Sequence, residues 1–167
     1  FSFVMEEALK NDIHIETSSA FDIPIIESLY ESGKVRKDMY IICNGFKRPQ
    51  YIENICNLIE EGFENVIPIL DNKFELDEYD RNITRKIKIG IRIASEEEPK
   101  FDFYTSRLGI RYNDIVSYYE EEIKNNPKFE LKMLHFFINT GIRDSAYYWN
   151  ELLKCVNVYC ELKAVCP

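Results

Sequence analysis

The sequence predicts an α/β fold, an incomplete (β/α)8 TIM barrel of about five βα units with parallel strands. Short runs rich in β-branched residues alternate regularly with longer segments of helical period. Runs this rich in apolar residues are usually covered on both faces, as in parallel sheets. The chain has 167 residues, whereas a complete barrel needs about 250. We therefore expect residues 1–167 to form a single fragment of one barrel domain.

Five segments are predicted to be strands, because β-branched, aliphatic or aromatic residues are frequent in each of them. The strongest is KIKIGIRIA, in which isoleucine recurs at every second position. The strands are expected at residues 12–17, 39–44, 66–70, 86–94 and 129–137.

Six segments of helical period accompany these strands. Asp22 is a candidate N-cap with Pro24 in the first turn, and Gly33 and Gly62 follow the ends of two helices. The helices are expected at residues 1–10, 22–33, 49–61, 74–82, 113–124 and 143–162. A glycine-rich phosphate-binding motif follows none of the strands in the sequence, which disfavours a doubly wound nucleotide-binding sheet.

Two classes of function are disfavoured by the composition and the hydrophobic pattern of the sequence. The 29 acidic and 21 basic side chains give a net charge of −8, which disfavours a nucleic-acid partner because phosphate binding needs a basic face. An apolar run long enough to cross a membrane is missing from the sequence. The five cysteines are odd in number and lack CxxC spacing, so we expect reduced thiols, no metal site and a cytoplasmic location.

Chemistry in such a barrel is expected at the carboxyl ends of the strands, where the βα loops begin. Among the side chains predicted there, small hydroxyls, an amide, an arginine and an aromatic ring suit an anion and a flat ring. The side chains predicted there include Glu16, Ser19, Asn44, Asp71, Arg92, His135, Phe137 and Thr140.

Five local strings in this order resemble one enzyme family. They are IETSSAFDI at 15–23, ICNGFK at 42–47, GIRIA at 90–94, SRLGI at 106–110 and LHFFINTG at 134–141. The series resembles the alanine-racemase-like barrel of the fold-type III decarboxylases, which act on ornithine, diaminopimelate and arginine. The ICNG and LHF strings are most similar to biosynthetic arginine decarboxylases. The resemblance covers nearly the whole chain and implies a pyridoxal-phosphate-dependent conversion of arginine to agmatine and CO2 in polyamine biosynthesis.

The resemblance implies roles for residues around the cofactor ring. Glu16 would be a catalytic acid near the cofactor lysine, and Ser19 lies in the small-residue turn beside it. Arg92 would oppose the ring oxygen as a fixed cation. Phe137 stands where the family has a histidine stacked on the ring; a phenyl ring keeps the stacking but donates no hydrogen bond. His135 is a candidate catalytic proton carrier, with a satisfied interior histidine as the alternative.

The resemblance also assigns cofactor contacts to Arg107, the basic residue of a [KR]-F-G motif in which Leu108 replaces the phenylalanine, and to Thr140, which keeps a hydroxyl for the phosphate. Each residue has a structural alternative. Arg92 could form an ion pair, for example with Glu16, and Phe137 could belong to the core. Arg107 could be a surface charge, and Thr140 could cap the last helix.

The resemblance places the lysine that anchors the cofactor just before Phe1, so this chain alone is expected to be inactive. The substrate would be a small amino acid, and the intact enzyme would be a homo-oligomer. The alternatives are an ornithine or diaminopimelate decarboxylase, an amino-acid racemase, or a non-catalytic protein that binds pyridoxal phosphate.

Overall fold

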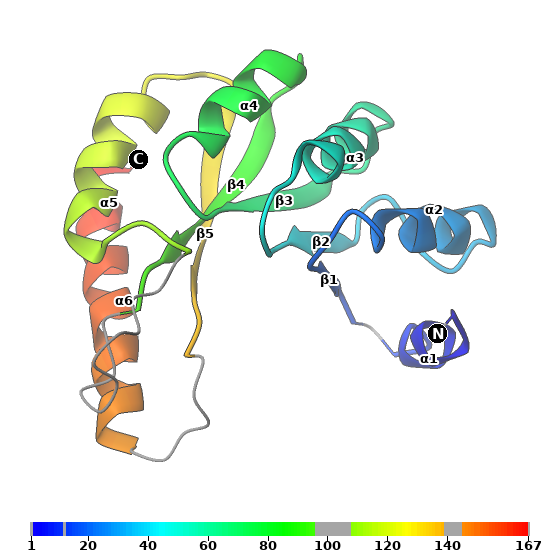
Figure 1. Ribbon diagram of the computed structural model, residues 1–167, viewed down its shortest axis with the longest axis horizontal. Coiled ribbons are helices and arrows are strands. Elements are labelled where there is room, and N and C mark those ends of the chain that lie inside the picture. The colour runs from blue at the N-terminus through cyan, green and yellow to red at the C-terminus, as the bar shows by residue number, and fades with distance from the viewer. Residues whose placement is uncertain (1, 12, 96–107, 139–144, 167) are drawn as a thin grey trace.

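The computed structural model describes residues 2–11, 13–95, 108–138 and 145–166. Within these ranges, five parallel strands form one sheet in the order β1-β2-β3-β4-β5 (Figure 1). The strands are β1 (Ile15–Thr17), β2 (Tyr40–Cys43), β3 (Asn65–Leu70), β4 (Ile87–Ile93) and β5 (Phe129–Phe136). The helices are α1 (Ser2–Ala8), α2 (Ile23–Glu31), α3 (Pro49–Glu60), α4 (Glu75–Asn82), α5 (Tyr112–Tyr118) and α6 (Ser145–Val165).

The strand order confirms the predicted fold class. Each strand pairs in parallel with the next one along the chain. A doubly wound sheet would reverse its strand order at a switch point, and a sheet that always grows in one direction keeps its right-handed crossover helices on one face. The described residues therefore form part of a singly wound barrel wall.

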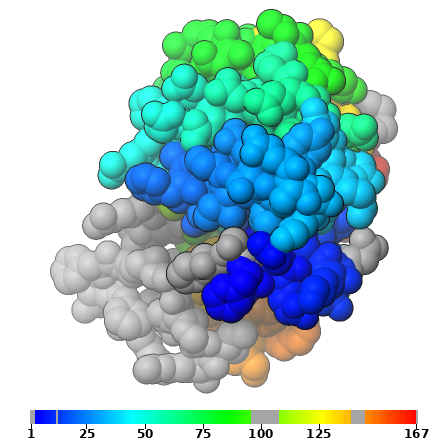
Figure 2. Space-filling view, turned by 90° about the vertical axis from the view of Figure 1, so that its right-hand side faces the viewer, coloured from blue at the N-terminus to red at the C-terminus, as the bar shows by residue number. Residues whose placement is uncertain are grey.

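The helices cover the outer face of this wall. Figure 2 shows α1, α2, α3 and α4 following one another across one side of the molecule, from dark blue to green. Proline stands in the first turn of both α2 and α3, where its missing N–H costs no hydrogen bond. The main core lies between helices and sheet and includes Ile26 of α2, Leu58 of α3 and Ile89 of β4, all at most 1% exposed.

The alternation of side chains along each strand creates a second, inner face. On β4, Ile89 and Ile91 are fully buried among the core residues, whereas Gly90 and Arg92 take the alternate positions. A Cβ at Gly90 would lie 2.4 Å from Cδ1 of Ile69 and 3.3 Å from the carbonyl oxygen of Met133. The isoleucine thus fills the inner face directly beneath Arg92.

Local details differ from the sequence predictions. The helix expected at 113–124 begins as α5 and ends in a π-helical turn, η1 (Tyr119–Ile123), which no local sequence signal predicted. Asp22 occupies the N-cap position of α2, but its carboxylate turns back to accept from the amides of Ser18 and Ser19 at 2.7 and 2.9 Å. None of the helices in the described ranges is long and apolar enough to span a membrane.

Candidate functional site at the carboxyl ends of the strands

Polar side chains gather on the inner face where the strands end. Strand pairing sets Glu16 beside Ile42 and Arg92 beside His135, and the residues that follow β2, β3 and β5 complete the group. We call these polar side chains, together with the neighbouring ring of Phe137, the rim cluster. It comprises Glu16, Asn44, Asp71, Arg92, His135 and Phe137.

One half of the rim cluster is connected through Asn44. Its Nδ2 atom lies 3.0 Å from Oε1 of Glu16 and 3.0 Å from Nε2 of His135, so a single amide joins β1 to β5. The backbone N–H of Asn44 donates to the carbonyl of Thr17 at 2.9 Å. Gly45 follows with φ +79°, and a Cβ there would lie 2.3 Å from the carbonyl oxygen of Ser18. Only glycine fits this turn, which fixes the direction of Asn44.

The other half of the rim cluster surrounds Arg92. The NH1 atom of Arg92 is 3.7 Å from Oδ1 of Asp71, and its guanidinium lies 5.4 Å from the ring centre of Phe137. The arginine side chain is 12% exposed, whereas Phe137 is 48% exposed. The suggested pairing of Arg92 with Glu16 is wrong, because the carboxylate that follows the adjacent strand β3 lies closer to the guanidinium.

A buried charged layer adjoins the rim cluster and shares Asp71 with it. The ammonium of Lys47 donates to the carbonyls of Gly45 at 2.7 Å and Ile69 at 2.6 Å, and lies 3.4 Å from Asp71 and 3.9 Å from Glu75. The lysine and Asp71 side chains are 0% exposed. Glu75 accepts the backbone N–H of Asp71 at 3.0 Å. Burial raises the pKa of Glu75 to about 7, against the lowering effect of Lys47.

Unsatisfied polar atoms concentrate in the rim cluster. Among the described residues, five buried side-chain atoms have no hydrogen-bond partner. Four belong to the cluster, namely Asn44 Oδ1, Asp71 Oδ1, Arg92 Nε and His135 Nδ1. The ion pair between Arg92 and Asp71 does not satisfy them, because 3.7 Å is too long for a hydrogen bond. Each such atom costs about 1–3 kcal/mol, and in a native fold it calls for an explanation, such as a catalytic role or a bound water or ion.

His135 is not the satisfied interior histidine that the sequence left open, since only one of its two ring nitrogens has a partner. Burial lowers its pKa, and the positive charge of Arg92 lowers it further. The nearby carboxylate of Glu16 acts in the opposite direction. A lowered pKa favours the neutral imidazole near pH 7.

The remaining site predictions fall outside this cluster. Ser19 donates from its hydroxyl to Asp22 at 3.2 Å, and so belongs to a local turn before α2. Arg107 and Thr140 lie outside the described residues. Sequence reasoning placed Asn44 and Asp71 at strand ends without a role, and missed Lys47 and Glu75. The only signal for Lys47 was its position in the ICNGFK string, directly after the strand end.

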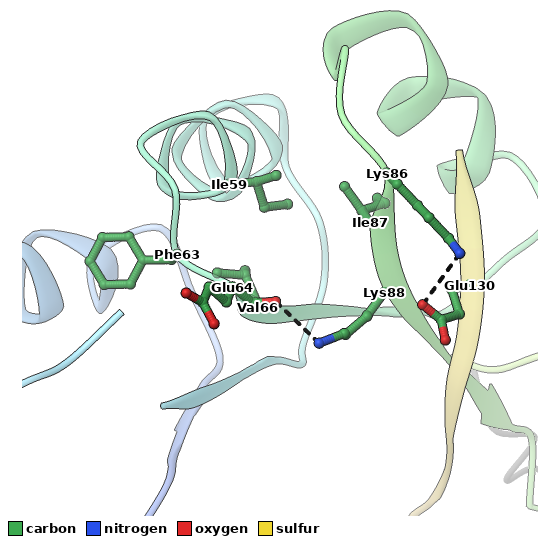
Figure 3. A pocket seen from close by; sticks show the side chains of 8 residues that line it. All are labelled: Ile59, Phe63, Glu64, Val66, Lys86, Ile87, Lys88 and Glu130. Carbon is green, nitrogen blue, oxygen red and sulfur yellow. Dashed lines mark hydrogen bonds and ion pairs between the residues drawn. The ribbon is translucent and has the colours of Figure 1, made fainter. Parts of the chain in front are cut away.

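A second hollow lies at the opposite end of the strands. It is a cavity of about 200 Å3, and Figure 3 shows the side chains that line it, which come from α3, β3, β4, β5 and the segments just before β3 and β4. Lys86 pairs with Glu130 at 3.6 Å, and Lys88 donates to Asn65 at 2.5 Å. The ammonium groups of Lys86 and Lys88 therefore both have partners, and this amino-terminal end of a barrel contributes to stability rather than chemistry. The rim cluster is the stronger candidate.

Comparisons with known proteins give consistent relatives. No protein-family model matches the chain. It is 27% identical over 156 residues to a biosynthetic arginine decarboxylase of Prochlorococcus marinus. The aligned region covers 89% of this chain and 23% of that protein. It is 24% identical to the biosynthetic arginine decarboxylase of a Geobacter species, over 74% of this chain and 20% of the relative. Biosynthetic arginine decarboxylase 2 of a Synechocystis species is 28% identical, over 73% of this chain and 20% of that protein.

The fold has a solved counterpart. Lysine decarboxylase from Selenomonas ruminantium superposes with a TM-score of 0.72 at 15% sequence identity, over 98% of this chain and 40% of that chain. The chain thus spans less than a quarter of the arginine decarboxylases it matches and less than half of the solved structure. Over most of its own length, this chain is similar in sequence to biosynthetic arginine decarboxylases, and it has the fold of a decarboxylase barrel domain.

Proposed function

We propose that residues 1–167 form the cofactor-facing part of the barrel domain of a pyridoxal-phosphate-dependent decarboxylase that acts on arginine. The observation that carries the proposal is the rim cluster, in which Arg92 and His135 hold unpaired buried donors at the carboxyl ends of adjacent strands. The similarity to biosynthetic arginine decarboxylases supports the choice of substrate.

The rim cluster fits the ring half of pyridoxal phosphate. Arg92 offers a guanidinium with an unpaired Nε, which suits a negatively charged ring oxygen. Phe137 offers a half-exposed ring beside that guanidinium, which suits stacking on a flat heterocycle. Thr140 and Arg107 remain predictions for the phosphate and for a basic contact, carried by the sequence resemblance.

The residues of this chain would perform three tasks in the reaction. When bound, pyridoxal phosphate supplies an electron sink for loss of the carboxylate. Arg92 would hold the ring oxygen, with Asp71 at 3.7 Å keeping the guanidinium in place. Phe137 would cover one face of the ring and exclude water from it. Glu16, exposed at the end of β1, would take up or release a proton at its carboxylate.

The test is CO2 release by the full-length protein that carries this sequence, supplied with pyridoxal phosphate and offered arginine, ornithine, lysine and diaminopimelate in parallel. Release from arginine alone is the expected result. Release from ornithine or diaminopimelate would move the proposal to that substrate. Cofactor binding is monitored by the absorbance of pyridoxal phosphate. If the protein binds no cofactor, the proposal is refuted.

A variant pair connects the activity to the rim cluster. Arg92→Gln should lower kcat/KM by about 100-fold, the scale of losing one fixed donor opposite a developing or resident negative charge. Arg81→Gln removes an equivalent charge from an exposed pair on α4 and should leave activity unchanged. Equal activities of the two variants would remove Arg92 from the site.

The second candidate function is a protein that binds pyridoxal phosphate but does not catalyse decarboxylation. Phe137 stands where the resembled family has a histidine, so cofactor binding with no CO2 release from any of the four amino acids would favour a non-catalytic binding protein. Phe137→His would then be the substitution to examine, because it restores a ring donor at the same position.

A further inference from the structure

The side chain of Asn44 makes two hydrogen bonds that determine which ring nitrogen of His135 carries the proton. Its Nδ2 atom approaches both Oε1 of Glu16 and Nε2 of His135 at 3.0 Å. An amide nitrogen has two N–H donors, and a carboxylate can only accept. One N–H therefore goes to Glu16 and the other to His135, so Nε2 of His135 is an acceptor and carries no proton.

The opposite orientation of the amide fails on the same geometry. Rotating Asn44 by half a turn would bring Oδ1 against the carboxylate of Glu16, so that two acceptors would face each other. Glu16 thus fixes the orientation of the amide, and the amide fixes the ring of His135. In a neutral imidazole the proton must then lie on Nδ1.

The charges around His135 come from every neighbouring strand end. Arg92 on β4 and Lys47 behind β2 and β3 disfavour a protonated ring, whereas Glu16 on β1 and Asp71 after β3 favour one. Burial outweighs these charges and lowers the pKa of His135. The hydrogen bond from Asn44 acts in the same direction, because protonation of Nε2 would break it.

We propose that Asn44 is a positioning residue that holds His135 neutral with its proton on Nδ1, so that no second positive charge arises beside Arg92. The geometry of the rim cluster alone fixes the hydrogen bonds of Asn44 and the tautomer of His135. Its consequence for catalysis rests on the proposed function, because a charged imidazole beside Arg92 would repel the guanidinium that holds the ring oxygen.

The decisive measurement is nuclear magnetic resonance of the ring nitrogens in the full-length protein labelled with 15N-histidine. This chain contributes two histidines, His14 and His135, and the signal of His135 is the one lost in His135→Gln. At about pH 7 the ring should be neutral with Nδ1 protonated and Nε2 free. A proton on Nε2 in the unsubstituted protein would overturn the proposal without any variant.

Asn44→Ala should release the fixed tautomer and move the protonation of His135 to higher pH, because the neutral ring loses its hydrogen bond. Asn57→Ala, an exposed position on the outer surface of α3, is the matched control and should leave the signal unchanged. A variant at Asn44 that keeps both the tautomer and the titration of the unsubstituted protein would also overturn the proposal.

The activity of the same variants tests the catalytic consequence. Asn44→Ala should lower kcat/KM by about tenfold, the worth of one hydrogen bond to an oriented or charged group, with the loss growing as pH falls. Combining it with His135→Gln should remove that added pH dependence. If the protein releases no CO2 at all, the proposed function fails, while the tautomer measurement still decides the role of Asn44.

Discussion

Lys47→Met tests the buried layer that supports the rim cluster. The substitution removes a fully buried ammonium but keeps most of the volume of the side chain. It leaves Asp71, also 0% exposed, with Arg92 at 3.7 Å as its remaining cation. It also leaves the carbonyls of Gly45 and Ile69 without their donor.

The expected loss of unfolding free energy follows from these contacts. Removing one partner of a buried ion pair costs about 3–5 kcal/mol. Glu75 lowers that figure, because its pKa of about 7 rises further once Lys47 is gone, and the carboxyl then takes up a proton. We therefore expect a loss of about 3 kcal/mol at neutral pH, near the lower end of that range. The loss should shrink as the pH falls, because a protonated Glu75 needs no counter-ion.

Urea unfolding of the full-length protein measures the effect, with Lys34→Met as the matched control. Lys34 pairs with Glu6 at 2.5 Å, but both side chains are about 40% exposed, and an exposed pair contributes about 0–1 kcal/mol. Lys47→Met must therefore be clearly less stable than the control. If the two variants unfold together, the buried layer does not support the site.

Two further predictions concern the same end of the sheet. The pKa of Glu75 is raised from 4.5 to about 7 in the fold, so its contribution to stability is present below pH 4.5 and is lost as the pH rises through 7. Glu75→Gln should remove up to about 3 kcal/mol of this pH dependence, and urea midpoints measured across that range check it. Gly90→Ala should cost about 1–3 kcal/mol by overpacking against Cδ1 of Ile69. Adding Ile69→Val, which removes that atom, should recover most of the loss in the same unfolding assay.

The sequence predicted the fold well because the strands are strongly marked. Isoleucine at alternate positions and proline in the first turns of α2 and α3 are local signals, and the parallel sheet follows from the regular alternation. The π turn of η1 was missed, because a π turn and an α turn suit the same local sequence of tyrosine and glutamate. Its position is set by packing, since Tyr119 and Ile123 are both buried.

Part of the candidate site could be predicted from the sequence, because the strands and their ends were recognisable. The rule that strand ends share one edge named Glu16, Arg92, His135 and Phe137, and the structure brings these four residues to the inner face. Their hydrogen bonds could not be predicted, because the rotamers of Asn44 and Asp71 decide them. Lys47 was missed since a lysine in a loop is usually exposed, and its burial depends on carbonyl groups of two different strand ends.

The two layers at this edge differ in a way that separates stability from function. In the buried charged layer, Lys47 contacts two carbonyls and two carboxylates, and Glu75 accepts a backbone N–H. In the adjoining rim cluster, Asp71 and Arg92 approach without forming a hydrogen bond. A fold selected only for stability would close that gap, because unpaired buried atoms oppose folding. The well-connected ammonium of Lys47 holds Asp71 in place, and the rim cluster keeps unpaired atoms that a ligand with its own charge and acceptors can complete.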